Sequence, residues 1–351
     1  MSFDPWKDVP FAHGGPAATG LIRCEPGDFL VEEDLGFEPS GAGEHLFLRL
    51  RQVGCNTRWV AGRLARWARR PARDVGYAGL KDRHAVTEQW FSVRCPGGRH
   101  PDPDGLAVPG VTLVDWCLGD RKLRPGALAG NRFVIRVRNL AGDRQTLEAR
   151  LSRIRSSGAP NPFGPQRFGR DSGNLERARA WFAGGDAPRR AERAFALSAA
   201  RALIFNAVLA DRLSRGSWDT AGDGEPVQLE GSRSWFLADG ADEALPGRLS
   251  ALDVHPTGPL WGQGLPPGKG GEHEAELATA GEHGLFAVGL ESAGLDQDRR
   301  PLRVRVRDLD WAAEGDVITL AFRLPPGSYA TAVLREAVDA ADNAQRASSR
   351  T

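Results

Sequence analysis

The sequence predicts an α+β fold whose core is interrupted by an insertion. Strand-like segments dominate up to residue 137, helices and loops fill the middle, and strand-like segments return at residue 302. Strands and long helices do not alternate regularly, as they would in a doubly wound sheet. The 351 residues can form one large domain or two of ordinary size, with enough apolar side chains for a substantial core.

The first strands are predicted from alternating apolar and polar side chains. Residues 28–32 and 45–50 show this period of two, which is typical of half-buried strands. Further strands are expected at residues 75–80, 89–94, 111–117 and 133–137.

Two helices are predicted within and directly after this strand-rich part. Asn56 and Thr57 can cap the first helix, in which Trp59, Val60 and Leu64 recur at helical spacing. The second helix covers residues 143–156 and ends at Gly158.

The pattern changes at residues 158–162, which are rich in glycine and proline. Helices are predicted at residues 174–182 and 193–215. Glycine and proline dominate residues 222–295, where we expect short strands at most, at residues 227–229 and 235–237. The remaining elements are strands at residues 302–307 and 317–324, a helix at residues 331–340 and a frayed polar tail from residue 342.

The composition is that of a soluble globular protein. Hydrophobic residues make up 41% of the chain, and 46 basic against 45 acidic residues leave a formal charge of +1. The longest apolar runs, such as residues 196–202 and 317–322, fall short of the roughly 20 residues of a membrane span. No basic stretch followed by an apolar stretch opens the chain, so we expect a cytoplasmic protein.

The cysteines and glycines give no sign of a metal or a nucleotide cofactor. Cys24, Cys55, Cys95 and Cys117 lie far apart without a Cys-x-x-Cys pair, so we expect reduced thiols. No glycine-rich phosphate loop is present. Only four of the 46 basic residues are lysines, a bias that reflects codon usage, so arginine richness alone is weak evidence for RNA binding.

The segment from Tyr77 to Trp90 is the strongest candidate for catalysis. An apolar strand leads into Lys81-Asp82-Arg83-His84. A carboxylate at a strand end, surrounded by cations, stays ionised and can act as a nucleophile or an electrostatic stabiliser. The alternative is a surface turn with solvated charges. His84 and Glu88 lack a third ligand at a recognisable spacing, so no metal is expected.

Three other segments suit contact with nucleic acid. Residues 161–170 interleave phenylalanine with arginine on a glycine-hinged loop, which favours base stacking and phosphate pairing. The cations of residues 121–124 could bind phosphates. Residues 324–331 place Tyr329 in a turn before a helix. The alternatives are core packing of the phenylalanines and of Tyr329, and a solvated loop at residues 121–124.

Together these segments resemble the TruD family of tRNA pseudouridine synthases. The resemblance is carried by residues 79–90, Gly-Leu-Lys-Asp-Arg-His-Ala-Val-Thr-Glu-Gln-Trp. Supporting blocks occur in the family's order over nearly the whole chain, from about residue 20 to 340. These blocks are residues 26–29, 43–45, 56–57, 130–133, 161–169, 198–201, 205–206 and 327–331.

The resemblance implies a catalytic domain built from both ends of the chain around a mixed, mostly antiparallel sheet flanked by helices. An α/β domain particular to the family, the TRUD domain, is inserted into it. The expected division is residues 1–159 and 301–341 for the catalytic domain, 160–300 for the insertion and 342–351 for a flexible tail.

The resemblance also implies an activity. The family isomerises uridine to pseudouridine at position 13 of tRNA, without a cofactor, and Asp82 matches its catalytic aspartate. We expect Asp82 to assist cleavage of the glycosidic bond before C5 bonds to C1′. A covalent adduct at the sugar and removal of a sugar proton both remain open. We expect a monomer that binds tRNA.

The family's other site residues match named positions in this sequence. Arg23 stands where the family places a lysine, and we expect it to pair with Asp82. Phe29, Phe133 and Tyr329 would form aromatic walls, and Asn131 would bind the polar edge of the substrate. The candidates for contact with tRNA are Lys81, Arg121, Lys122, Arg167 and Arg170.

Two other functions fit parts of the pattern. One is an RNA-binding or tRNA-folding protein that keeps the scaffold without turnover. The other is a glycoside hydrolase that uses Asp82 and Glu88 as a carboxylate pair. Because the net charge is close to zero, RNA binding would depend on a local basic surface and would be sensitive to salt.

Overall fold

The computed structural model describes residues 3–81 and 85–343. The chain divides into two compact units, each assembled from separate parts of the sequence. Unit 1 comprises Met1–Ala17, Arg144–Val306 and Ser328–Val338, and unit 2 comprises Ala18–Asp143, Arg307–Gly327 and Asp339–Thr351. These boundaries differ from those of the predicted domains, and the assignment of domain roles remains a prediction.

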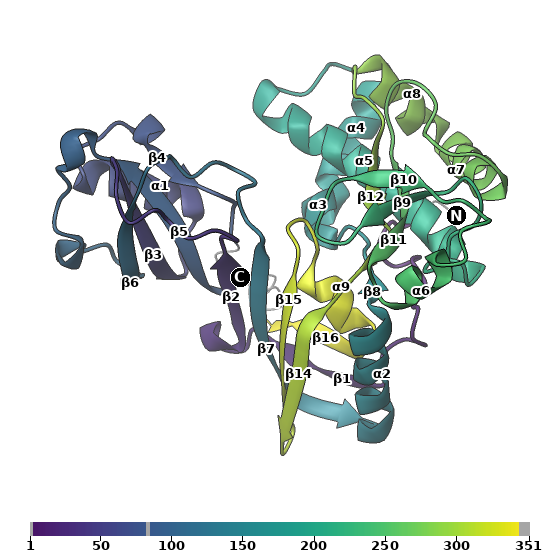
Figure 1. The fold of residues 1–351 in the computed structure, drawn as a ribbon, viewed down its shortest axis with the longest axis horizontal. Helices are drawn as coiled ribbons and strands as arrows, with labels where there is room; N and C mark the ends of the chain where they lie inside the picture. The colour runs from purple at the N-terminus through teal and green to yellow at the C-terminus, as the bar shows by residue number, and fades with distance from the viewer. Residues whose placement is uncertain (1–2, 82–84, 344–351) are drawn as a thin grey trace. The chain divides into compact units, whose positions relative to one another are not determined.

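Unit 2 contains a ten-stranded sheet, which confirms the predicted α+β class (Figure 1). Strands β2 and β5 run parallel, and the other strand pairs with a described register are antiparallel. The main order is β14 (Arg307–Glu314), β15 (Val317–Leu324), β7 (Gly130–Gly142), β2 (Phe29–Asp34), β5 (Val86–Arg94), β3 (His45–Val53) and β6 (Val111–Gly119). Strands β1 (Ala18–Ile22), β16 (Val338–Asp342) and β4 (Val75–Tyr77) pair at its sides.

The first predicted helix forms as the sequence suggests. Helix α1 (Thr57–Trp67) begins after Asn56, whose side chain accepts a hydrogen bond of 2.9 Å from the backbone N–H of Arg58. Val60 and Leu64 are fully buried and pack in one cluster with the buried side chains of β3 and β5. Figure 1 shows α1 beside β4 and β5 in this unit. Its apolar stripe therefore covers the sheet, as amphipathic spacing requires.

The C-terminal helix is shorter than predicted. Helix α9 ends at Arg335 (Ala330–Arg335), and the chain then forms β16, which pairs with β1. Strand β1 was not predicted. Neither strand has a strong pattern of its own, and each is stabilised by pairing with a segment over 300 residues away in sequence. Asp342, assigned to a flexible tail, is the last residue of β16.

Unit 1 combines helices with a small sheet. The sheet order is β10 (Trp235–Leu237), β9 (Pro226–Leu229), β11 (Val254–Leu260) and β12 (Asp298–Pro301), and β8 (Ala159–Pro160) pairs with β13 (Arg303–Val304). The helices are α2 (Arg144–Ser157), α3 (Pro165–Phe168), α4 (Gly173–Phe182), α5 (Arg190–Ser214), α6 (Leu245–Ser250), α7 (Gly271–Glu282), α8 (Gly284–Ser292) and α9. Short 3₁₀ helices complete the chain: η1 (Pro26–Asp28), η2 (Ala72–Asp74), η3 (Pro96–Gly98), η4 (Pro103–Gly105) and η5 (Arg170–Ser172).

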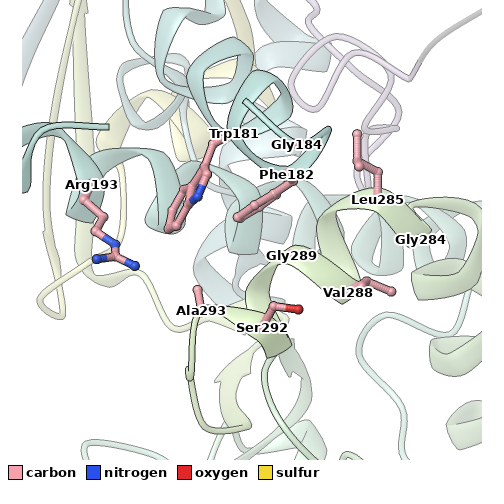
Figure 2. Close-up of a pocket in the computed structure, with 10 residues that line it drawn as sticks. All are labelled: Trp181, Phe182, Gly184, Arg193, Gly284, Leu285, Val288, Gly289, Ser292 and Ala293. Carbon is pink, nitrogen blue, oxygen red and sulfur yellow. The ribbon is translucent and has the colours of Figure 1, made fainter. Parts of the chain in front are cut away.

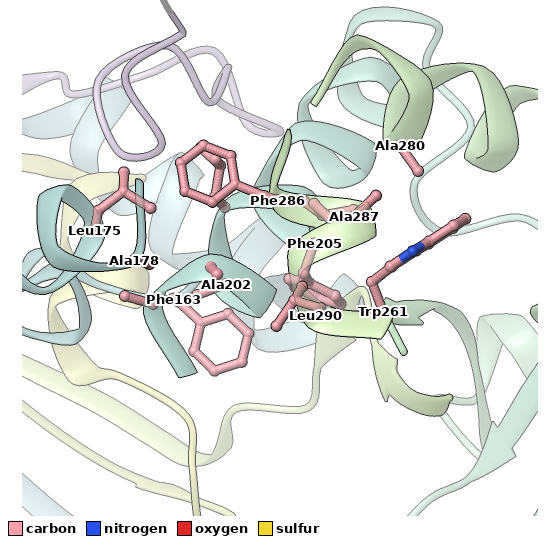
Figure 3. Packing of buried hydrophobic residues seen from close by; sticks show 14 of the residues in the cluster. Phe163, Leu175, Ala178, Ala202, Phe205, Trp261, Ala280, Phe286, Ala287 and Leu290 are labelled. Atoms are coloured by element: carbon pink, nitrogen blue, oxygen red, sulfur yellow. The ribbon is translucent and has the colours of Figure 1, made fainter. Parts of the chain in front are cut away.

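Helix α5 is the centre of the unit 1 core. Phe205 is fully buried and contacts Phe163 edge-on, with ring centroids 5.4 Å apart, and Trp261 and Phe286 belong to the same cluster (Figure 3). By length and composition α5 could cross a membrane, but 67% of its apolar 18-residue stretch is buried. Burial of this kind is found in the core helices of water-soluble proteins.

The expectation of little structure in residues 222–295 was wrong. This region contains α6, β11, α7 and α8. Glycine and proline occur within these elements, which hides the usual periodicity. In α8, Gly289 lies against the ring of Phe182, where any Cβ would clash. Glycine here serves close packing between α8 and α4 and does not end a helix.

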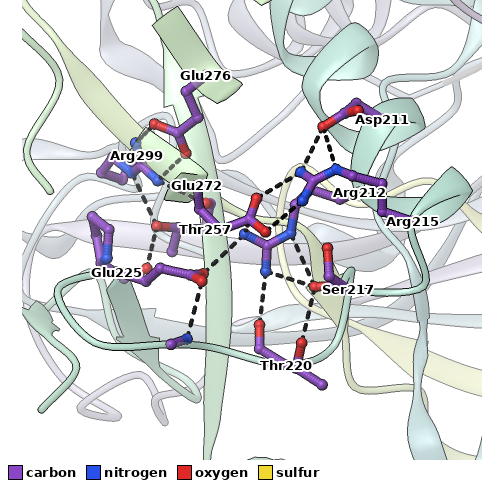
Figure 4. A network of polar contacts seen from close by, with 12 residues as sticks. Asp211, Arg212, Arg215, Ser217, Thr220, Glu225, Thr257, Glu272, Glu276 and Arg299 are labelled. Atoms are coloured by element: carbon purple, nitrogen blue, oxygen red, sulfur yellow. Dashed lines mark hydrogen bonds and ion pairs between the residues drawn. The ribbon is translucent and has the colours of Figure 1, made fainter. Parts of the chain in front are cut away.

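Buried ion pairs hold the same region together (Figure 4). Arg212 of α5 pairs with Glu225 at 2.9 Å and with Glu272 at 3.1 Å. Arg299 of β12 makes two bonds of 2.7 Å to Glu276 of α7. Bidentate geometry of this kind offsets the cost of removing both charges from water. Charged residues thus fix α7, which has few buried apolar side chains.

Replacing Phe205 by alanine should destabilise unit 1 by about 3–5 kcal/mol, because a large buried ring leaves a cavity. Phe195→Ala on the same helix is the matched control, since that side chain is 51% exposed and its loss should change the free energy of unfolding by less than about 0.5 kcal/mol. Urea unfolding curves of the two variants test the difference. Equal midpoints would contradict this account of the core.

Candidate active site

The loop that follows β4 is held in place by a buried ion pair. The ammonium group of Lys81 lies 2.9 Å from Oε1 of Glu33 on β2 and donates a hydrogen bond to the side-chain oxygen of Asn131 on β7. The Lys81 side chain is 8% exposed and that of Glu33 is fully buried. Three segments of unit 2 therefore meet at the residue that precedes Asp82.

A network of buried hydrogen bonds fixes the backbone of the same loop. Gln89 of β5 donates to the carbonyl of Gly79 at 2.6 Å and accepts from the hydroxyl of Thr57 at 3.1 Å. The Thr57 hydroxyl in turn accepts from the backbone N–H of Lys81 at 3.0 Å. Gln89 also donates to Glu33 at 3.2 Å. With its partners satisfied, such a network rigidifies the loop.

Burial perturbs both members of the Lys81–Glu33 pair. Desolvation raises the pKa of Glu33, and the nearby Lys81 ammonium group opposes this shift. Desolvation lowers the pKa of Lys81, and Glu33 opposes this shift in turn. Each partner therefore keeps the other ionised, and removal of either would leave a buried charge without compensation.

Strand register places the other predicted residues on the same face of the sheet. Glu33 pairs with Asn131, Val31 with Phe133 and Phe29 with Ile135, between β2 and β7. Side chains two residues apart along a strand point to the same face. Phe29 and Phe133 are in edge-on contact, with ring centroids 6.4 Å apart.

Arg23 joins this group from the segment after β1. Its guanidinium carbon lies 4.1 Å from the centroid of the Phe29 ring, and its Nη1 pairs with Asp342 at 2.6 Å. The Arg23 backbone has a φ of +56°, in the left-handed region that side chains other than glycine rarely adopt. Strained backbone of this kind persists where the surrounding structure imposes it, often at functional sites.

The residues at the centre of the prediction, Asp82 to His84, lie outside the described residues. The pairing of Arg23 with Asp82 therefore remains a prediction. The flanks of the segment are defined, since Lys81 is held as described above and Ala85 is buried.

Tyr329 and Arg167 come together in unit 1. The tyrosine hydroxyl accepts a hydrogen bond of 3.1 Å from Nε of Arg167, whose Nη1 also donates to Ser198 at 2.8 Å. The Tyr329 ring contacts Phe163 edge-on at 6.3 Å. Arg167 is therefore engaged within the chain, and its contact with tRNA stays a prediction.

The remaining candidates differ in exposure. Arg121 and Arg170 are exposed, and Arg121 lies over the ring of Phe37. Lys122 donates a hydrogen bond to the carbonyl oxygen of Arg73. Lys81 is nearly buried and paired, a position that favours support of the loop over contact with phosphate groups.

The sequence did not predict the structural role of several residues that build the site. Glu33, Thr57 and Gln89 form the polar network, and Phe322 stacks on Phe133 with centroids 5.5 Å apart. The available signal was a polar residue at a buried position of an apolar strand, as in Glu33 and Gln89. In unit 1 the missed residue is Arg300. It stacks 4.2 Å from the Phe163 centroid and donates to the Asn161 side chain at 2.7 Å, and burial lowers the pKa of Arg300 to about 10.

Unit 1 also contains an apolar surface groove of about 520 Å³ (Figure 2). Trp181 and Phe182 from α4 and Leu285 and Val288 from α8 line it, with Arg193 at its side. None of the predicted site residues lies in it. Across residues 3–81 and 85–343, no group of three or more His, Cys, Asp or Glu side chains could hold a metal ion.

Comparison with known proteins identifies the family of this chain. Residues 10–186 and 183–337 match the family model described as tRNA pseudouridine synthase D (TruD). The chain belongs to the TruD family.

Individual relatives agree with this assignment. The chain is 47% identical to tRNA pseudouridine synthase D of Nitrosococcus oceani over 344 residues, with 96% of each chain covered. It is 48% identical to the protein of the same name from Methylococcus capsulatus, with 95% of each covered. A crystal structure of a Methanosarcina mazei protein that carries the TruD name shares the fold, with a TM-score of 0.71 at 20% identity, over 96% of this chain and 98% of that one.

Replacing Lys81 by methionine should destabilise unit 2 by about 3–5 kcal/mol near neutral pH, because Glu33 is left buried without its cation. Glu33 would then stay protonated when folded but ionise when unfolded, so the unfolded state binds fewer protons above pH 4–5 and stability falls as pH rises. Denaturant unfolding at pH 5 and pH 8 should show the larger deficit at pH 8.

The double variant Lys81→Met, Glu33→Gln is the control for this prediction. It removes both charges, so its stability should depend less on pH than that of Lys81→Met. A single variant with the same deficit at both pH values would contradict the role assigned to the pair.

Proposed function

We propose that this chain is a tRNA pseudouridine synthase that isomerises uridine to pseudouridine, at position 13 of its tRNA substrates. The observation that carries the proposal is the anchoring of the chain up to Lys81 by the buried Glu33 pair and the Gln89 network, on the sheet face that also bears Phe29, Asn131 and Phe133. Membership of the TruD family supports the reaction.

The reaction is an isomerisation and needs no oxidant or group donor. The C1′–N1 bond breaks, the base turns, and C5 bonds to C1′; C5 loses a proton and N1 gains one. The carboxylate of Asp82 assists the first step, either by bonding to C1′ or by removing a sugar proton. A preorganised charge at this point lowers the barrier because it does not have to reorient during the reaction.

Arg23 is the proposed cationic partner of Asp82. A guanidinium group has five N–H donors, so Arg23 can pair with a second carboxylate in addition to Asp342. The ring of Phe29 beneath Arg23 restricts where the guanidinium can lie. Lys81 directly precedes Asp82 in the sequence, but Glu33 neutralises its charge.

The target uridine must leave its stack, at a cost of roughly a few kcal/mol that aromatic contacts and hydrogen bonds offset. Phe29 and Phe133 are proposed as aromatic walls, with Asn131 as the polar contact. Asn131 already accepts from Lys81, so its amide N–H₂ donors remain for the base. Tyr329 is proposed as a further aromatic wall.

We also propose that the protein acts as a monomer in the cytoplasm, where its tRNA substrates are made and used. All four cysteines are free thiols, as suits a reducing compartment. Binding of tRNA should weaken as salt concentration rises.

Replacing Asp82 by asparagine should abolish pseudouridine formation while tRNA binding stays within a few-fold of wild type, because the change removes charge and keeps size. Mapping of pseudouridine in total tRNA, with and without each protein, is the measurement. An active Asp82→Asn or Asp82→Ala protein would remove this mechanism. A wild type that binds tRNA without modifying it would support a tRNA-folding role, and release of free uracil would indicate a hydrolase.

Replacing Arg23 by methionine should lower kcat by roughly 10²–10³-fold, the cost of losing one preorganised electrostatic contact. Arg23→Lys is the matched control, since it keeps the charge that the family has at this position, and it should retain most of the activity. Single-turnover rates at saturating tRNA separate chemistry from binding. Equal activity in both variants would exclude Arg23 as the partner of Asp82.

A further inference from the structure

The charges of this nearly neutral chain are unevenly distributed. Residues 53–73 contain six arginines and no acidic residue, so the other 330 residues together carry a formal charge of −5. The segment comprises α1 and the turn after it. Its arginines are Arg58, Arg63, Arg66, Arg69, Arg70 and Arg73. A basic region of this kind within a neutral chain is the usual electrostatic mark of a polyanion-binding surface.

Helical spacing gathers part of this charge on one exposed stripe. Val60 and Leu64 face the sheet and are fully buried. Trp59, Arg63 and Arg66 follow one another by four and three residues, which places them together on the opposite face of α1. All three are exposed.

The arginines of this segment are not used to pair carboxylates. In the part of the chain that the structure describes, no ion pair involves any of the six, whereas Arg94, Arg144 and Arg248 each pair with an acidic side chain. The helix dipole explains Arg66 near the C-terminal end of α1. It does not explain Arg58, in the first turn, or Arg63, which precedes the last turn, because the favourable effect on cations is confined to the C-terminal turn.

The backbone conformation of Arg69 indicates that a positive charge is retained at this position despite an unfavourable conformational energy. It follows the last turn of α1 with a φ of +52°, at the position where helices usually have glycine or asparagine. A side chain with a Cβ is disfavoured in this conformation.

An aromatic ring lies within the basic stripe. Trp59 is 38% exposed, and the guanidinium group of Arg63 lies over its ring, 4.9 Å from the centroid. An exposed indole beside unpaired arginines suits single-stranded RNA, in which bases stack on aromatic rings while phosphates pair with guanidinium groups.

The helix that carries the stripe begins beside the candidate active site of the same unit. Its first residue, Thr57, is buried and accepts a hydrogen bond from the backbone N–H of Lys81, which precedes Asp82 in the sequence. Beyond its end, Lys122 donates to the carbonyl of Arg73, which adds a cation predicted to contact tRNA. The 11 residues of α1 span about 16 Å at 1.5 Å per residue. A strand bound at the site could thus continue along α1.

We propose that the outward face of α1, with Trp59, Arg63, Arg66 and Arg69, is a second tRNA-binding surface that takes the phosphate backbone and one unstacked base of the substrate. The naming of tRNA as the ligand rests on the proposed function. An anionic membrane is the other polyanion to consider. The apolar face of α1 is buried against the sheet, however, so α1 has no free apolar face to insert into a bilayer.

The triple variant Arg63→Gln, Arg66→Gln, Arg69→Gln tests the proposal in the full chain. Fluorescence anisotropy with an unmodified tRNA transcript should show a Kd raised about tenfold or more at moderate salt. The slope of log K against log salt should fall by about 2–3, because each phosphate that an arginine neutralises accounts for roughly 0.7–0.9 of that slope. The value of kcat at saturating tRNA should stay unchanged while KM rises.

The matched control removes the same charge elsewhere. Arg94→Gln, Arg144→Gln, Arg248→Gln replaces three arginines that have carboxylate partners and should leave the salt slope as in wild type. If both triple variants lose affinity equally, the effect is one of net charge and the proposal is wrong. Trp59→Ala should weaken binding roughly tenfold and Trp59→Phe much less, since a phenyl ring can still stack.

Two further outcomes distinguish failure of this inference from failure of the proposed function. If the wild type modifies tRNA but the α1 variant binds tRNA as tightly as wild type, this inference fails and the proposed function stands. If the wild type shows no turnover, the proposed function fails while anisotropy still reports on α1. Vesicles containing phosphatidylglycerol test the membrane: α1-dependent binding to them without any α1-dependent binding of tRNA would overturn the proposal.

Discussion

The buried pair of Lys81 and Glu33 is the interaction on which the site depends. It joins the loop after β4 to β2, and Asn131 extends the contact to β7. Two opposite charges in a dry interior offset the cost of their desolvation only when they lie close together and form additional hydrogen bonds. Both conditions hold here, because Trp90 and Gln89 also donate to Glu33. The pair therefore sets the position of the residue before Asp82 more strictly than apolar packing would.

The same reasoning explains why short polar motifs recur in the sequence signature. Thr57 lies at the start of α1 and Gln89 within β5, more than 30 residues apart, yet they share a hydrogen bond. Neither is exposed enough to bind a substrate directly. We infer that they serve the site by holding the backbone of Gly79 and Lys81, the described residues that lead to Asp82 in the sequence.

Much of the large sheet could be predicted because its strands have a clean period of two, as in β15, where every second side chain is buried. The prediction failed where structure depends on distant partners. Strand β1 pairs with β7 and β16, and the Arg299–Glu276 pair joins β12 to α7. All these partners are distant in sequence except α7 and β12, so local patterns carry little information about these elements. For the site, the sequence pointed to Arg23, Phe29 and Phe133, whose roles stay predictions, whereas the buried partner of Lys81 could be identified only from the register of β2.

The distribution of charge accounts for how a nearly neutral chain can bind a polyanion. Several acidic side chains of the sheet have cationic partners, as in Glu88 with Arg49 and Asp28 with Arg138. Pairs of this kind cancel locally and contribute little field at a distance. The arginines of α1 have no carboxylate partner among the described residues, so their charge adds to the field that a tRNA meets although the total charge is close to zero. The overall composition counts charges within ion pairs together with the arginines of α1, so it does not reveal the proposed binding surface.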